Sequence, residues 1–354
     1  MEWGVAESAT LREGPSEFNL RCARRTALGT GRFRRGGGVG KSGRPTLQLR
    51  VALARLSAPF RGTVELTPPQ LVLAAMELAL LATGVFLLAT RFGPRGKREK
   101  FFSSLSLPRW SLTGAEVTLL VLLVLLCGAA GQSLASRLLA PRLHASPDHA
   151  GLEIAVLGLA FHSLALLGWP VFFLLRRYFL GQPVPVPPPA GSPEARRPRL
   201  SWPEVFGRAV PALAMSLPVV SAVSYLWTQL LAILHLPTEP QDLLAIFGDG
   251  HSRLVFAGMI VVACVVAPVN EELIFRGAIF RSVNQRFGRI VGLVFSSVFF
   301  GTIHGNWAGA LPLAVLGAAL ALAYERSGDL RVNIVIHGLF NLNTILMLVS
   351  GLPQ

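Results

Sequence analysis

The stretch "VVAPVNEELIFRGAIF" at residues 265–280 places three charged side chains inside an otherwise apolar segment. Glu271 and Glu272 follow a run of apolar residues, and Arg276 comes four positions after Glu272. A charged side chain inside a membrane is costly and therefore faces a partner or a polar cavity. The stretch accordingly predicts a helix that crosses a membrane, and it marks candidate functional residues.

The composition of the whole chain is that of a membrane protein. Of its 354 residues, 52% are hydrophobic and only 15% are charged, whereas soluble domains have about 25% charged residues. Long apolar runs recur, as expected for membrane-spanning helices. We therefore predict an all-α, polytopic membrane helical bundle with about eight transmembrane helices. The expected spans are approximately 69–90, 113–136, 152–175, 206–235, 253–283, 289–304, 309–325 and 331–350.

The segments around these spans suggest a division into four parts. Residues 1–66 hold 12 Lys/Arg against 5 Asp/Glu, and we predict a disordered basic extension that reflects an over-extended start. Residues 67–180 contain the first three spans. Residues 181–200 are predicted to be a Pro-rich cytoplasmic linker. Residues 201–352 contain five spans and all the candidate site residues.

The positive charge of the chain predicts its orientation rather than a nucleic-acid partner. The net charge is +14, and outside the N-terminal extension it lies mainly in short loops between spans. Basic loops at 91–110, 176–205 and 281–289 are expected in the cytoplasm. The abundance of Ala, Gly, Pro and Arg is typical of a bacterial chain. We therefore expect a multi-pass protein of the bacterial inner membrane whose partner is the lipid bilayer and whose site opens to the cytoplasm.

The spacing of the charged residues in the opening stretch suggests two roles. Glu272 and Arg276 are four residues apart and share one helix face, so the guanidinium can neutralise and orient that carboxylate. Glu271 lies about 100° round the helix and is left for another task. The alternative is a purely structural ion-pair cluster at the membrane edge.

A histidine in the next span is a second candidate. Glu271 lies 17 residues before Gly288, and His304 lies 16 residues after it. If the chain turns near residues 286–289, an antiparallel hairpin places the carboxylate and the imidazole at a similar depth, where they can share one water. The alternative is that His304 forms a hydrogen bond that holds two helices together.

The last span carries a polar stripe. Asn333, His337 and Asn341 are spaced i, i+4, i+8, and Thr344 extends the same stripe. One interpretation is a hydrogen-bonding seam between helices. The other has His337 and Asn341 donating to an oxyanion, where each donor contributes about 3–4 kcal/mol. Four single ionisable residues in or beside the early spans are interpreted as interfacial or packing residues: Glu77, Glu116, Glu153 and His162.

Together these groups supply what peptide hydrolysis needs. A glutamate deprotonates a water, a histidine positions it or shuttles the proton, and a His/Asn pair holds the tetrahedral oxyanion. Two other functions are compatible with buried charges: a transporter that uses them as a relay, and a non-catalytic membrane scaffold or immunity protein.

Three ordered motifs give the chain a resemblance to a known family. E-E-x-x-x-R ends at Arg276, F-x-x-x-H ends at His304, and H-x-x-x-N runs from His337 to Asn341, on successive apolar segments about 30 residues apart. Together they resemble the CPBP intramembrane proteases, a family also called Abi that includes the CAAX prenyl endopeptidases. The resemblance covers roughly residues 201–350, which would form a CPBP-like catalytic core.

The resemblance implies a mostly eight-helix fold and proteolysis of membrane-associated or lipidated peptides. It implies that Glu271 is the water-activating base with His304 beside it, that His337 and Asn341 form the oxyanion pocket, and that Glu272 with Arg276 organises the site. Such proteases have been described both with and without a metal. We favour no metal and no cofactor. The alternative is zinc held by Glu271, His304 and His337.

Overall fold

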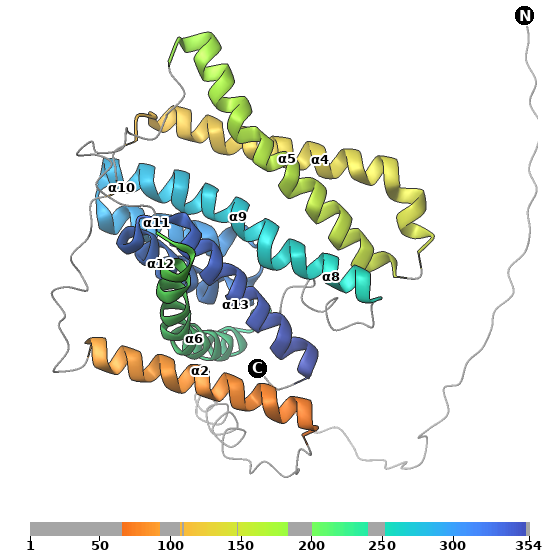
Figure 1. Cartoon of the computed structure of the whole chain (residues 1–354), viewed down its shortest axis with the longest axis vertical. Coiled ribbons are helices and arrows are strands. Elements are labelled where there is room, and N and C mark those ends of the chain that lie inside the picture. Colours follow the sequence, from red (N-terminus) through yellow and green to blue (C-terminus); the bar gives the residue numbers. More distant parts are fainter. Residues whose placement is uncertain are drawn as a thin grey trace, which may run out of the picture. The chain divides into compact units, whose positions relative to one another are not determined.

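The computed structural model describes residues 66–92, 107, 110–146, 148–182, 200–239 and 252–351. Residues 1–65 of the predicted extension, most of the basic loop at 91–110 and residues 183–199 of the Pro-rich linker lie outside the described residues, so those interpretations stay predictions. Within the described part, every regular element is a helix (Figure 1). The predicted all-α class is therefore confirmed.

Seven helices of the described part are long and apolar enough to cross a membrane, so the chain is a multi-pass membrane protein. The eighth predicted span, at 289–304, is helix α11 (Arg289–Ile303), which has 15 residues and is shorter than the about 20 that a bilayer requires. Six of the long helices are α2 (Pro68–Phe92), α4 (Gly114–His144), α5 (His149–Leu180), α6 (Trp202–Ile233), α12 (Trp307–Ser327) and α13 (Leu330–Ser350).

Local sequence signals set where several of these helices begin. Helix α4 starts with a capping box, in which Thr113 and Glu116 each bond the backbone N–H of the other. Helix α6 starts in the same way with Ser201 and Glu204. Asn306 caps α12 by accepting a bond from the Gly309 N–H. These caps satisfy backbone donors that would otherwise be unpaired at the helix ends.

The seventh long helix, Arg253–Phe287, changes its winding four times and carries the opening stretch of the sequence. Its segments are α8 (Arg253–Val261), η2 (Val262–Val266), α9 (Ala267–Glu272), η3 (Leu273–Phe280) and α10 (Arg281–Phe287), where η2 and η3 are π-helical. The two glutamates end the short α segment between the π segments. Wide turns of this kind are found frequently at functional sites.

Pro268 and the η2 segment change which backbone groups of this helix are paired. Pro268 has no N–H to offer the Cys264 carbonyl four residues before it. The Ala267 N–H bonds the Val262 carbonyl, five residues back, instead of the Ala263 carbonyl. The Ala263 and Cys264 carbonyls therefore lack their usual donors within the helix and can face a neighbouring helix.

That neighbour is α13. It lies against η2, α9 and η3, and α5 lies against α8, η2 and α9 on another side (Figure 1). A Cβ added at Gly338 would clash with the Cys264 carbonyl oxygen, so only glycine permits this approach. The broken helix thus has close neighbours from both halves of the chain at the level of its glutamates.

Candidate active site

Glu272 and Arg276 form the ion pair that their spacing predicts. The Glu272 Oε1 and Arg276 Nη1 atoms are 2.7 Å apart, and the two side chains are 0% and 1% exposed. Arg276 Nη2 also donates to the Gly317 carbonyl at 3.2 Å, and its guanidinium lies 4.4 Å from the centre of the Phe300 ring. The pair is therefore buried inside the helical bundle.

The same carboxylate also binds two residues of α13. His337 Nδ1 lies 2.9 Å from Glu272 Oε1, and Asn333 Nδ2 donates to Glu272 Oε2 at 3.3 Å and to the Leu320 carbonyl at 2.6 Å. An ionised carboxylate only accepts hydrogen bonds, so His337 carries a hydrogen on Nδ1. Glu272 thereby fixes the orientation of the imidazole, whose other nitrogen, Nε2, lies towards Glu271.

Glu271 differs from its neighbour because one of its oxygens is free of hydrogen bonds. Its Oε2 lies 3.7 Å from His337 Nε2, longer than a direct hydrogen bond. Within the described residues this oxygen is buried and has no hydrogen-bond partner. The side chain as a whole is 25% exposed, against 0% for Glu272. The two glutamates therefore differ. Both Glu272 oxygens accept hydrogen bonds, whereas Glu271 Oε2 has no partner among the described residues and can bind another group.

His304 lies directly after the end of α11, on the same aromatic ring as His337. Its Nδ1 is 2.7 Å from the Phe300 carbonyl oxygen, so this nitrogen donates and Nε2 keeps a lone pair when the ring is neutral. The Phe300 ring centre lies 5.0 Å from that of His304 and 5.6 Å from that of His337. The imidazole that the structure brings to Glu271 is that of His337, and the predicted sharing of a water between Glu271 and His304 stays a prediction.

The polar stripe on α13 divides among different partners. Asn333 and His337 bind Glu272, whereas Asn341 Nδ2 donates to the Ala263 carbonyl at 2.7 Å. That carbonyl belongs to η2, where the π turn has given the Ala267 N–H to Val262. Asn341 therefore connects α13 to the broken helix and keeps one further N–H for another acceptor. The Thr344 hydroxyl bonds the Phe340 carbonyl of its own helix.

Two early residues that looked single in the sequence have partners. Glu116 binds Arg176 at 2.7 Å, which ties α4 to α5. His162 lies on α5 with its Nδ1 3.2 Å from Asn270 Nδ2, and Asn270 is 1% exposed and immediately precedes Glu271. Sequence reasoning missed Asn270, although a polar amide beside two membrane-embedded glutamates was a signal. The structure thus adds Asn270 and His162 to the surroundings of the candidate site.

The described side chains do not fit the zinc alternative. They contain no group of three or more His, Cys, Asp or Glu side chains placed to hold a metal ion. Glu271, His304 and His337 are therefore not gathered into a ligand set, and no chemical step below is derived through a metal.

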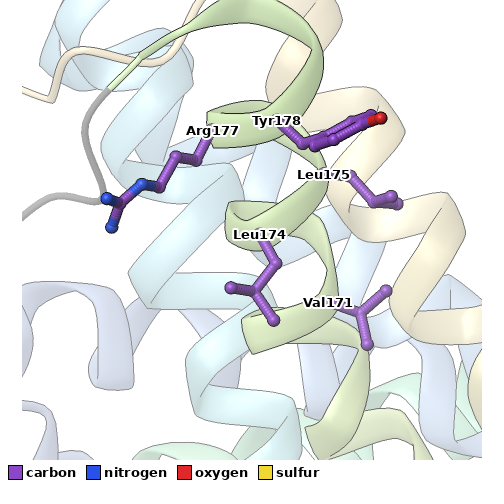
Figure 2. Close-up of a pocket in the computed structure, with 5 residues that line it drawn as sticks. All are labelled: Val171, Leu174, Leu175, Arg177 and Tyr178. Carbon is purple, nitrogen blue, oxygen red and sulfur yellow. The ribbon is translucent and has the colours of Figure 1, made fainter.

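A surface hollow of about 700 Å³ lies elsewhere, along the outer side of α5. Figure 2 shows its five lining residues, all from this one helix: Val171, Leu174, Leu175, Arg177 and Tyr178. Tyr178 and Leu175 point away from Arg177 in this view (Figure 2). The leucines and Tyr178 are strongly exposed and no candidate site residue lines the hollow, so it is not part of the candidate site.

Comparisons with known proteins agree with the motifs. Residues 253–343 match the family model described as type II CAAX prenyl endopeptidase Rce1-like. The chain is 32% identical over 89 residues to the "Putative membrane peptidase YdiL" of Bacillus subtilis, covering 25% of this chain and 36% of that protein. It is 34% identical over 95 residues to the "UPF0177 protein YaiF" of Lactococcus lactis, covering 25% of this chain and 40% of that protein.

These matches cover little more than a third of each relative's length. No solved structure gives a significant match. The C-terminal region nevertheless contains a domain similar to the CAAX prenyl endopeptidase-like membrane peptidases, which confirms the resemblance stated from the three motifs. The two relatives named here are bacterial proteins.

Proposed function

We propose, from the CAAX prenyl endopeptidase-like domain at residues 253–343, that this protein is an intramembrane endopeptidase that hydrolyses a membrane-associated or lipidated peptide. The observation that carries the proposal is the pair formed by Glu271 and His337. A buried carboxylate oxygen without a hydrogen-bond partner among the described residues faces an imidazole nitrogen at 3.7 Å. One water or one substrate oxygen can bridge such a distance.

In the proposed reaction Glu271 is the general base. It takes a proton from a water, and the resulting hydroxide attacks the carbonyl carbon of the scissile peptide bond. The carbonyl oxygen becomes the oxyanion of a tetrahedral intermediate. When that intermediate collapses, the C–N bond breaks and Glu271 returns its proton to the departing amine. The carboxylate thus ends the cycle as it began, and one water has been added across the bond.

The oxyanion needs donors fixed in place before the reaction starts. In its doubly protonated form His337 keeps one N–H on Glu272 and offers Nε2–H to the oxyanion. Asn341 has one amide hydrogen on the Ala263 carbonyl and one left to donate. The bonds from Glu272 to Arg276, Asn333 and His337 support this role because they leave the imidazole little freedom to turn.

The resemblance to the CPBP proteases suggests that His304 lies beside the attacking water. Its Nδ1 bond to the Phe300 carbonyl makes Nε2 the acceptor nitrogen of the neutral ring. The proposed orientation, with the site open to the cytoplasm, follows from the basic loops of the sequence. A bacterial cell membrane is the proposed location.

The experiment is cleavage of a panel of membrane-anchored and lipidated peptides by the purified full chain in lipid nanodiscs. The wild type should cut at least one peptide, and Glu271→Ala and His304→Ala should each cut far more slowly. Cleavage that persists in both variants would refute the site. Solute flux through reconstituted vesicles without any cleavage would favour a transporter instead.

A further inference from the structure

His162 brings the first half of the chain to the candidate site. It lies on α5, outside the matched region, and its Nδ1 is 3.2 Å from the Nδ2 atom of Asn270. Asn270 is 1% exposed, so its amide depends on protein partners for hydrogen bonds. Its chain neighbour is Glu271.

Small residues permit α5 to come this close. A Cβ added at Gly158 would lie 2.9 Å from a methyl group of Val262, and one added at Gly258 would lie 3.3 Å from Ala155. Ala155, Gly158 and His162 are spaced three and four residues apart, which places them on one face of α5. The two small residues thus bring α5 against α8 and η2, and His162 follows one turn later beside α9.

The contact determines which His162 nitrogen carries the hydrogen and how the Asn270 amide is oriented. An amide nitrogen only donates hydrogen bonds, so His162 Nδ1 accepts here, and the neutral ring carries its hydrogen on Nε2. Asn270 Oδ1 is buried and has no hydrogen-bond partner among the described residues. The bond to His162 is therefore what holds the Asn270 amide in one orientation.

We propose that His162 is a positioning residue of the site, which holds Asn270 and thereby fixes the end of α9 that presents Glu271. This inference rests on the proposed peptidase function. It also changes the expected division of the chain, because residues 201–352 would then lack one of the groups that organise the site. Helix α5 becomes part of the catalytic unit rather than a membrane anchor only.

Three variants in the full chain test the proposal. His162→Ala removes the acceptor of the Asn270 amide. His162→Asn places a carbonyl oxygen close to where Nδ1 lies and restores the acceptor without the ring. Ser163→Ala, at the neighbouring exposed position, is the control for a change on the same helix. Each is assayed for kcat and KM on a peptide that the wild type cleaves, and its thermal unfolding is recorded.

We expect kcat to fall about tenfold in His162→Ala, which corresponds to about 1.4 kcal/mol in the barrier, with KM within twofold of the wild type. His162→Asn should recover most of that loss, and Ser163→Ala should match the wild type. The proposal is overturned if His162→Ala and Ser163→Ala have the same kcat, or if His162→Ala changes KM alone.

A second measurement does not need activity. In protein with ¹⁵N-labelled histidine, the signals of His162 are assigned by their loss in His162→Asn. They should show a hydrogen-bonded, unprotonated Nδ1, and this signal should move in Asn270→Leu. Unchanged His162 signals in Asn270→Leu overturn the proposal. If the wild type cleaves nothing, the proposed function fails by itself, and this spectrum still decides whether His162 holds Asn270.

Discussion

The Glu272 carboxylate and the His337 imidazole lie 2.9 Å apart, Oε1 to Nδ1, with the two side chains 0% and 4% exposed. Arg276 binds the same oxygen at 2.7 Å. The Glu272 carboxylate lies between the guanidinium and the imidazole and orients both groups, and its two oxygens are already bonded to protein side chains. The reactive group of this site is therefore expected to be its neighbour, Glu271.

The two glutamates should respond differently to the same change. Glu272→Gln leaves Arg276 without its charge partner in the interior, which is expected to lower the free energy of unfolding by about 3–5 kcal/mol. Glu271→Gln alters a partly exposed side chain that has one oxygen without a hydrogen-bond partner in the described part of the chain, and it should cost about 1 kcal/mol or less. Unfolding of both variants in mixed detergent micelles measures the difference, and equal losses would contradict the assignment.

Gly338 should tolerate no side chain. In Gly338→Ala the new methyl group meets the Cys264 carbonyl, and the forced separation of α13 from η2 is expected to destabilise the protein by about 1–3 kcal/mol. Gly207→Ala is the matched control because nothing lies within 4 Å of an added Cβ there, and loss of a helical glycine should be neutral or slightly stabilising. Thermal unfolding compares the two, and similar melting temperatures would contradict the close approach.

A substitution at Asn341 tests whether this residue has a catalytic or a structural role. If its second N–H stabilises the oxyanion, Asn341→Ala should lower kcat by about 10²–10³-fold. If the residue only holds the Ala263 carbonyl, unfolding stability falls while kcat of the folded enzyme is kept. Thr344→Val is the control, because the Thr344 hydroxyl bonds its own helix, and it should leave kcat near the wild-type value. We expect the loss of kcat.

Chelators should leave the activity unchanged. The described residues hold no group of three metal-ligating side chains, so 1,10-phenanthroline is expected to act no more strongly than its non-chelating isomer 1,7-phenanthroline. Metal analysis of the purified protein accompanies the assay. Inhibition that is specific to the chelating isomer and reversed by added zinc would contradict this expectation.

The sequence predicted the helices and the ion pair well because both follow from local rules. Apolar runs of sufficient length predict spans, and a spacing of four predicts that Glu272 and Arg276 meet. Neither rule depends on how distant helices pack. The hydrophobic run of Arg289–Ile303 was also found, but its 15 residues were counted as a full span.

The partner of each polar group was harder to predict. Estimating how far along a helix a side chain lies assumes the same rise for every residue. The π-helical segments on either side of α9 change the rise per residue and the direction in which side chains point, without altering the hydrophobic pattern. The contact of His337 with Glu271 was therefore not foreseen, and the predicted meeting of Glu271 with His304 stays a prediction. The Asn341 bond to the Ala263 carbonyl depends on the same unusual winding. His162 looked single because its partner, Asn270, is 108 residues away in the chain.

The central claim is that Glu271 activates the water that cuts the peptide. Its most direct test is the single-turnover rate of Glu271→Gln against wild type, on one membrane-anchored peptide in H₂¹⁸O, with folded protein quantified for both. We predict one ¹⁸O atom in the new carboxyl group and a rate at least about 10²-fold lower in the variant. A folded Glu271→Gln protein that cuts at the wild-type rate would contradict the claim.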